Sequence, residues 1–252
     1  MNGFQYLMKK RDAILASCGL FWLPSGMSAD NVLAAYQFIG VPSEEEALMD
    51  VSGNNRTLTK TSETVNGTTY TPTWSSSAGF IFQKAYQGKS GYLDNTSLNG
   101  QNILSAVVRY SNLSQDNRGY LITAGGTSGL AQLMAACTVY KSGVLNYTGP
   151  GYTSGSTAWR YDTTARTSGI LGANFGSADG LYFNGTKLTV TAVTGCTAAT
   201  GVTWHTFGNV HANASDLTNA DHAGKRIQAA VFFKTALTDD QMLEVYQRMS
   251  IL

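Results

Sequence analysis

From residue 31 onward, short apolar runs are separated by clusters of Gly, Ser, Thr, Asn and Asp. In several of these runs apolar and polar residues alternate, which is the pattern of a strand that buries one face. The strongest turn signal is Asn184-Gly185, because this pair suits the two positive φ values of a type I′ hairpin. The runs that predict strands are 32–39, 57–61, 79–82, 105–110, 120–124, 134–140, 180–183, 187–192 and 226–233. The pattern as a whole predicts an all-β domain.

The chain ends with its most sharply defined strand and helix. Residues 226–233 are apolar at almost every position, which suits a central strand covered on both faces. Thr238 and Gln241 have the spacing of a capping box, and two aspartates place negative charge in the first helical turn. Apolar residues then recur at helical spacing, at Met242, Val245, Tyr246 and Met249. We therefore expect a core strand followed by a short amphipathic helix that closes the domain.

Three regions depart from this pattern. Residues 1–30 mix apolar and basic residues, and we interpret them as an N-terminal arm or docking segment that precedes a main domain over residues 31–252. The alternative is that the arm packs on its own domain. Residues 141–179 and 193–222 are rich in small polar residues, which predicts long loops broken by short strands, or else edge strands with weak patterns. The candidate assembly contacts of the arm are Phe4, Tyr6, Leu7, Phe21, Trp22 and Leu23.

Composition narrows the classes of protein that the chain could represent. Its 252 residues are enough to bury a full hydrophobic core. Charged residues make up 13% of the chain, against about 25% in ordinary globular domains. The net charge of +1 offers no footprint for nucleic acid or for an anionic membrane, and no apolar run is long enough to span a bilayer.

The three cysteines Cys18, Cys137 and Cys196 show neither metal-ligand nor redox spacing. We interpret them as buried free thiols, which fits a protein that matures in a reducing cytosol. One disulfide with a spare thiol is the alternative.

Four sequence landmarks occur in the order typical of laminin-G-like, concanavalin A-like lectin-glucanase jelly-roll domains. L-A-A-Y-Q-F (33–38) and D-V-S-G-N-N-R-T-L (50–58) resemble the opening of these domains. L-Y-F-N-G-T-K-L (181–188) resembles one of their hairpins, and A-L-T-D-D-Q-M-L-E-V-Y (236–246) resembles the start of their closing helix. The resemblance covers residues 31–252. It implies an all-β, two-sheet antiparallel jelly-roll sandwich with a short C-terminal helix.

Some jelly rolls of this superfamily are glycosidases, which need two carboxylates about 5–9.5 Å apart. The chain lacks the Glu-x-Asp-x-Glu spacing that would place such carboxylates on one face of a strand. Its one acidic cluster, residues 44–46, is typical of a solvated loop. His205, His211 and His222 lack the i, i+4 spacing of helical zinc ligands. The sequence therefore predicts a protein that is not an enzyme.

A calcium site is one candidate for ligand binding, because relatives of this fold often hold one calcium ion. Asp50, Asn54 and Asn55 supply hard oxygen ligands in a turn that contains glycine. The alternative is an Asx-type turn that holds no metal. No other cofactor is expected.

A glycan site is the second candidate. The region over 147–161 combines flat aromatic faces with a guanidinium group and Gly-rich neighbours, a combination that suits sugar rings. The alternative is that these side chains are buried anchors of a loop. The candidate residues are Tyr147, Tyr152, Trp159, Arg160 and Tyr161.

The N-terminal arm, the low charge and the Gly/Ser/Thr/Asn texture favour a structural or adhesion protein of a bacteriophage particle. Such a protein would be a capsid decoration, head-fibre or tail component, assembled in the host cytoplasm and located in the virion. Its partners would be other virion proteins or copies of itself, and its lectin-like domain would contact glycans or proteins of the host surface. The alternative is a secreted or cell-surface bacterial carbohydrate-binding module. Neither nucleic-acid binding nor membrane insertion is expected.

Overall fold

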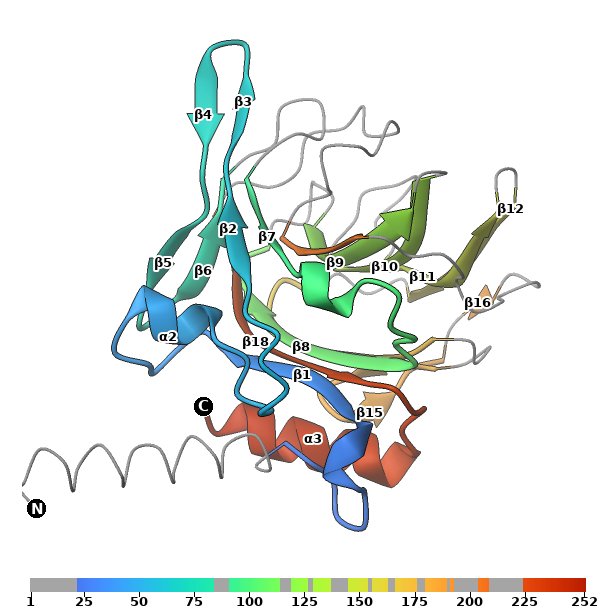
Figure 1. The fold of residues 1–252 in the computed structure, drawn as a ribbon. Helices are drawn as coiled ribbons and strands as arrows, with labels where there is room; N and C mark the ends of the chain where they lie inside the picture. Colours follow the sequence, from blue (N-terminus) through green and yellow to red (C-terminus); the bar gives the residue numbers. More distant parts are fainter. Residues whose placement is uncertain are drawn as a thin grey trace, which may run out of the picture.

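The structure is a computed structural model that describes residues 22–83, 91–113, 119–126, 129–136, 145–153, 156–162, 166–175, 180–189, 191–192, 204–208 and 224–252. This part of the chain forms two antiparallel β-sheets that pack face to face, with helix α3 (Asp239–Ser250) on the outer side of the first sheet (Figure 1). The predicted two-sheet sandwich with a C-terminal helix is confirmed.

The first sheet is built around β18 (Lys225–Phe233). β8 (Ser105–Ser111) pairs along one edge of β18, while β6 (Gly79–Phe82) and β1 (Val32–Gln37) share the other edge. Most residues of β18 are buried, as its apolar sequence predicts for a strand covered on both faces. The sheet continues from β8 through β13 (Gly169–Asn174), β14 (Leu181–Phe183) and β15 (Thr186–Lys187), and from β6 to β5 (Thr73–Ser75).

The second sheet faces the first. Its order is β16 (Thr191–Ala192), β12 (Ser156–Asp162), β11 (Leu145–Thr153), β10 (Gly129–Ala136), β9 (Gly119–Gly126), β17 (Trp204–Phe207), β7 (Tyr92–Asp94) and β2 (Thr59–Thr61). A separate hairpin of β3 (Glu63–Val65) and β4 (Thr68–Tyr70) extends beyond the sandwich (Figure 1). Short helices α2 (Glu44–Leu48) and η2 (Thr96–Leu98) lie in the connections of this half of the molecule.

The main core fills the space between the two sheets, and aromatic rings dominate its centre. Tyr36 stacks on Phe38 at 5.9 Å between ring centroids, and both meet Phe207 edge to face. Phe207 in turn meets Phe232 at 5.5 Å. Because Phe207 comes from the second sheet and Phe232 from the first, these rings hold the two sheets together.

A second core lies between the first sheet and α3. It buries Met242, Val245 and Met249 of the helix, together with Trp22 from the start of the described chain. The capping box predicted at Thr238 and Gln241 is present: each residue's side chain accepts a hydrogen bond from the other's backbone N–H. The helix therefore begins where its sequence predicts.

Residues 22–31, which we call the strap, run along α3 and end in the short helix η1 (Ala29–Asn31). Ser25 donates to Glu244 from both its backbone nitrogen and its hydroxyl, at 2.8 and 2.7 Å. Arg248 donates to the Leu23 carbonyl at 2.8 Å and pairs with Glu244. The hydrogen bonds from Ser25 hold the pKa of the Glu244 carboxyl below its ordinary value.

Two sequence predictions need correction. The region over 141–179 was predicted as long loops broken by short strands, yet β11 is nine residues long and β12 is seven, and the two pair as a hairpin. Apolar and polar residues alternate only over 145–148 in β11 and 159–162 in β12, so period-2 patterning predicts strands shorter than those observed. The second correction concerns residues 44–46, which form the first turn of helix α2, N-capped by Ser43, rather than a loop.

Candidate functional site

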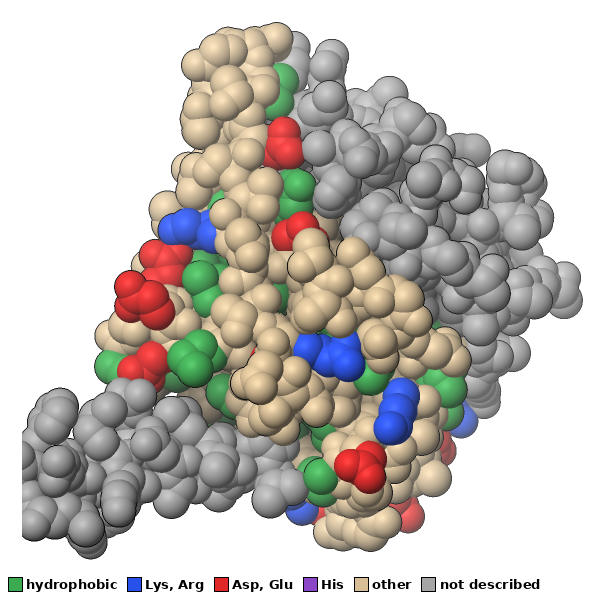
Figure 2. Space-filling view, viewed as in Figure 1, with side chains coloured by type: hydrophobic (Ala, Val, Ile, Leu, Met, Phe, Trp, Pro, Cys, Tyr) green, Lys and Arg blue, Asp and Glu red, His purple; other side chains and the backbone are tan. Residues whose placement is uncertain are grey.

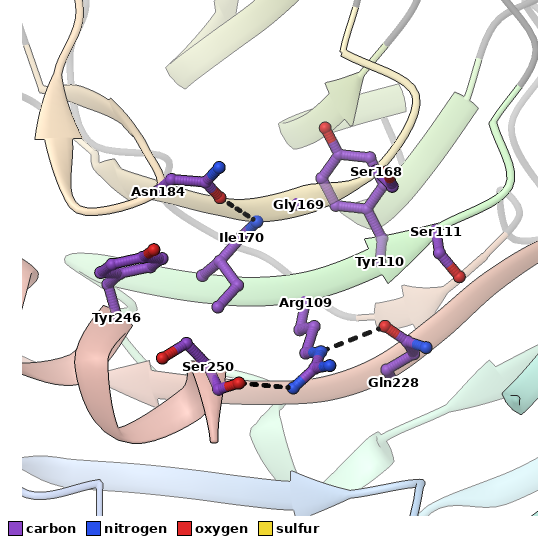
Figure 3. Close-up of a pocket in the computed structure, with 10 residues that line it drawn as sticks. All are labelled: Arg109, Tyr110, Ser111, Ser168, Gly169, Ile170, Asn184, Gln228, Tyr246 and Ser250. Atoms are coloured by element: carbon purple, nitrogen blue, oxygen red, sulfur yellow. Dashed lines mark hydrogen bonds between the residues drawn. The ribbon is translucent and has the colours of Figure 1, made fainter. Parts of the chain in front are cut away.

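A pocket of about 370 Å³ lies on the outer side of the first sheet, beside the C-terminal half of α3 (Figure 3). Strands β8, β13 and β18, the turn between β14 and β15, and helix α3 all contribute to its wall. Its volume falls in the range of sites that hold small ligands. The lining residues are Arg109, Tyr110, Ser111, Ser168, Gly169, Ile170, Asn184, Gln228, Tyr246 and Ser250.

Arg109 supplies the positive charge of this pocket. Successive side chains of a strand point to opposite faces, so Arg109 lies on the α3 side of β8 with Val107, while Val108 packs in the main core. Its Nε donates to Gln228 Oε1 at 3.2 Å, and its Nη1 donates to the Met249 carbonyl at 2.9 Å (Figure 3 draws the Gln228 bond). Burial lowers the pKa of the Arg109 guanidinium, which nevertheless keeps its charge at neutral pH. Arg109 thus caps the carbonyl end of α3 and carries its charge into the pocket.

Asn184 fixes the opposite side of the pocket. Asn184 and Gly185 adopt φ values of 48° and 75°, which fits the predicted Asn-Gly turn of a type I′ hairpin. The Asn184 side-chain oxygen accepts a hydrogen bond from the Ile170 backbone N–H at 2.9 Å (Figure 3). Gly185 lies so close to the Tyr246 ring that a Cβ there would meet it at 2.8 Å. The turn therefore sets the position of both an amide and an aromatic ring.

The pocket is lined by groups that can bind a ligand. It offers the Tyr246 ring, two side-chain amides, a guanidinium group and serine hydroxyls, whereas the Tyr110 ring is buried in the main core. None of its lining residues is Asp, Glu, His or Cys, so the lining supplies no carboxylate, imidazole or thiol.

A second polar cluster is buried at the edge of the main core. The Tyr36 hydroxyl donates to the Arg56 carbonyl at 2.5 Å and accepts a hydrogen bond from the Asn95 amide. Burial, followed by the nearby charge of Asp50, raises the pKa of Tyr36. His205 joins this cluster through its backbone, because its carbonyl accepts a hydrogen bond from the Asn95 backbone N–H at 2.9 Å. The cluster is closed to solvent, because Tyr36 and Asn95 are fully buried.

The residues predicted to bind calcium organise a turn. Asp50 accepts hydrogen bonds from the backbone N–H groups of Ala35, Ser52 and Arg56 at 2.9–3.1 Å. Asn54 donates to the Val32 and Leu33 carbonyls, and Asn55 takes a positive φ of 55°. This is the geometry of an Asx-type turn, the stated alternative. Within the described residues no cluster of three or more His, Cys, Asp or Glu side chains could hold a metal ion, and calcium binding stays a prediction.

The residues predicted to bind glycans lie in strands of the second sheet. Tyr147 and Tyr152 belong to β11, and the other three belong to β12. In the backbone register Tyr147 pairs with Arg160, while Trp159 pairs with Thr148. The prediction that they lie in a loop is therefore wrong. Their side chains are outside the described part of the structure. Glycan binding by this group stays a prediction.

Of the residues predicted for the N-terminal arm, the structure describes some and leaves the others out. Trp22 is 1% exposed and lies in the second core, and Leu23 packs against that core. This part of the arm packs on its own domain, which was the alternative. The other arm residues, Phe4, Tyr6, Leu7 and Phe21, lie outside the described residues, as do His211, His222 and all three cysteines.

Charges are sparse on the face shown in Figure 2, where acidic and basic side chains are scattered among uncharged polar ones. The described residues on that face form no continuous basic patch of the kind that nucleic acids require. None of the helices in the described part of the chain has both the length and the apolarity that a bilayer crossing requires.

Sequence reasoning missed the four residues that define the pocket: Arg109, Asn184, Gln228 and Tyr246. A signal was present for two of them. Arg109 and Gln228 are polar residues with an apolar or aromatic residue on each side, inside strands that are largely apolar. A polar side chain in such a strand needs a partner, and here the two partner each other.

No protein-family model matches the chain, and no curated protein matches it in sequence. Solved structures match its fold. The botulinum neurotoxin serotype C1 binding domain is 14% identical, with a TM-score of 0.54, over 86% of this chain and 52% of that one. The binding domain of botulinum neurotoxin DC in complex with rat synaptotagmin II is 15% identical, with a TM-score of 0.51, over 87% of this chain and 52% of that one. Trypanosoma rangeli sialidase in complex with sialic acid is 12% identical, with a TM-score of 0.57, over 99% of this chain and 40% of that one.

The chain therefore spans about half the length of the neurotoxin domains that it matches and a smaller share of the sialidase. At these identities the similarity shows the fold alone, and it agrees with the β-sandwich that the sequence predicts.

Proposed function

We propose that this chain is a non-enzymatic binding module that recognises glycans on a cell surface through the pocket beside α3. The observation that carries the proposal is the pocket itself, which combines an aromatic ring with amide, guanidinium and hydroxyl groups and contains no carboxylate pair. The fold gives weaker support, since solved structures of similar fold include a neurotoxin binding domain in complex with rat synaptotagmin II and a sialidase in complex with sialic acid.

The finer proposal is that the module acts as an adhesion component of a bacteriophage particle, with a laminin-G-like jelly roll as its binding domain. It is supported by the low charge, by the Gly/Ser/Thr/Asn texture and by the motifs at 33–38, 50–58, 181–188 and 236–246. In this account the segment before the strap docks on the particle. A secreted or cell-surface bacterial carbohydrate-binding module is the second candidate, because the same pocket would serve it.

A glycan microarray tests the binding function. We expect the full chain to bind a restricted set of glycans, and the variant Ser168→Trp to lose that binding because the large ring fills the pocket. Ser77→Trp is the matched control, since Ser77 is exposed and does not line the pocket. Absence of binding to any glycan, or release of reducing sugar from a bound glycan on incubation, would contradict the proposal.

The proposed docking of the N-terminal segment on a bacteriophage particle has a separate test. The native mass of the full chain is compared with that of a chain lacking residues 1–21, which keeps the buried Trp22. Assembly of the full chain but not of the shortened one supports a docking arm. Two identical monomers would favour the secreted or cell-surface module instead.

A further inference from the structure

The two side-chain amides of the pocket use their oxygen atoms in hydrogen bonds within the protein, whereas their NH₂ groups remain available to a ligand. Gln228 Oε1 accepts from Arg109 Nε, and Asn184 Oδ1 accepts from the Ile170 backbone N–H. Arg109 Nε and the Ile170 backbone N–H can only donate, so each amide must turn its oxygen toward that donor and its NH₂ group away from it. The Nε2 group of Gln228 and the Nδ2 group of Asn184 have no hydrogen-bond partner among the described residues. Each therefore offers two N–H donors.

Arg109 adds charge to this set of donors. Its Nε and Nη1 are engaged with Gln228 and with the last carbonyls of α3, while its Nη2 has no partner in the described chain. No described carboxylate forms an ion pair with Arg109, and none lines the pocket. A partly buried guanidinium without a counter-ion favours an anionic group beside it.

The ligand that complements these groups is rich in acceptors and carries negative charge. A carboxylate is acceptor-only and accepts charge-assisted hydrogen bonds from guanidinium and amide N–H groups. A single guanidinium matches a single negative charge, which favours a carboxylate over a phosphate dianion. The Tyr246 ring, next to Asn184 through the Gly185 contact, offers an apolar face for a sugar ring.

We propose that the pocket beside α3 recognises the carboxylate of an acidic sugar, either a hexuronic acid or a nonulosonic acid, within the glycan that the module binds. This inference rests on the proposed function and specifies its ligand. In the complex, Arg109 Nη2 and the Gln228 NH₂ group donate to the carboxylate oxygens, the Asn184 NH₂ group on the opposite side of the pocket donates to another oxygen of the sugar, and Tyr246 packs against the ring.

Calorimetric titration at pH 7 tests the inference with matched ligands. Methyl β-glucuronide is compared with methyl β-glucoside, which differs only in having CH₂OH in place of the carboxylate. The methyl glycoside of N-acetylneuraminic acid is compared with its methyl ester, and glucosamine 6-sulfate and acetate are added. We expect one of the two acids to bind at least about tenfold more tightly than its neutral partner. The acid that binds identifies the source of the carboxylate.

Two isosteric variants test the pocket directly. Asn184→Asp keeps the acceptor for Ile170, Gln228→Glu keeps the acceptor for Arg109, and each replaces an NH₂ donor by a charged oxygen. We expect each variant to remain folded and to lose acid binding at least about tenfold. Gln247→Glu is the control, because it makes the same charge change at an exposed position of α3 outside the pocket.

Several results would overturn the inference. They are equal binding of an acid and its neutral partner, tighter binding of the sulfated sugar, binding of acetate as tight as that of the sugar acid, and unchanged binding by both variants. If neutral glycans bind on the array while every acid fails, the inference falls and the proposed function stands. If no glycan binds at all, the proposed function itself fails.

Discussion

His205 is the described histidine whose ring is shut away from solvent, at 2% exposure. Neither ring nitrogen has a hydrogen-bond partner within the described residues. Burial lowers the pKa of His205 to about 4, and the charge of Arg56 adds to the effect. The folded protein therefore keeps His205 neutral at pH values where an unfolded chain would protonate it.

This burial predicts a specific dependence of stability on pH. Because the folded pKa lies below the unfolded value, the contribution of His205 is complete above pH 6.5 and is lost as pH falls toward 4. Over that window the free energy of unfolding falls by about 3 kcal/mol. We expect His205→Leu to remove this component, so that the free energy of unfolding of wild type falls more than that of the variant as pH is lowered. Urea unfolding at pH 7 and pH 4.5 measures it, and parallel decline of the two proteins would count against a neutral buried His205.

Tyr36 carries a second prediction at the scale of single residues. Its hydroxyl joins the Arg56 carbonyl to the Asn95 amide inside the core. Tyr36→Phe leaves those buried groups with fewer partners, so we expect a loss of about 1–3 kcal/mol in the free energy of unfolding. Tyr70→Phe is the control, since Tyr70 has no hydroxyl hydrogen bond in the described structure. Equal effects of the two substitutions would show that the Tyr36 hydroxyl contributes nothing to stability.

Among the elements, the strap is the one whose contribution is easiest to isolate. It buries Trp22 against α3 and is held there by Ser25, Glu244 and Arg248. A chain lacking residues 1–30 should be less stable than one lacking residues 1–21 by roughly 2–5 kcal/mol, the range for losing a large buried side chain. Trp22→Ala in the longer of the two should reproduce most of the difference. The measurement is the denaturant concentration at the midpoint of unfolding of the two shortened chains. Equal midpoints would mean that the strap does not anchor the domain.

The elements that were predictable share one property: a bulky apolar pattern. The 79–82 strand is β6 itself, 226–233 is β18 to within one residue, and the α3 start was fixed by its capping box. β11 and β12 were not recognised as long strands, because their pairing rests on backbone hydrogen bonds and local sequence barely encodes those bonds. The polar hairpin β3–β4 was also missed, although Asn66-Gly67 supplies the same turn signal as Asn184-Gly185.

At the scale of the whole molecule, the pocket was beyond the reach of sequence patterns. Its defining residues, 109, 184, 228 and 246, come from two strands, a turn and a helix. Only the register of β8 against β18 places Arg109 near Gln228, and only the packing of α3 brings Tyr246 to the 184–185 turn. The turn itself was predictable from Asn184-Gly185, but the internal bond that orients the Asn184 amide was not.

The strap and the pocket occupy different flanks of α3. Glu244 and Arg248 face the strap, whereas Tyr246 and Ser250 line the pocket. Residues 244 and 248 lie one turn apart on one side of a helix, and 246 and 250 lie on another. A particle bound at the strap flank would therefore leave the pocket accessible, so that docking and glycan binding are compatible in one molecule.

The most direct test of the account is an NMR titration of the ¹⁵N-labelled chain with the glycan that binds best on the array. Binding in the pocket beside α3 predicts that the Ile170 backbone amide, the Arg109 Nε–H and the Asn184 and Gln228 side-chain amides shift together, with one dissociation constant. Shifts confined to β11 and β12, including the Trp159 indole N–H, would contradict the account and place the binding site on the second sheet.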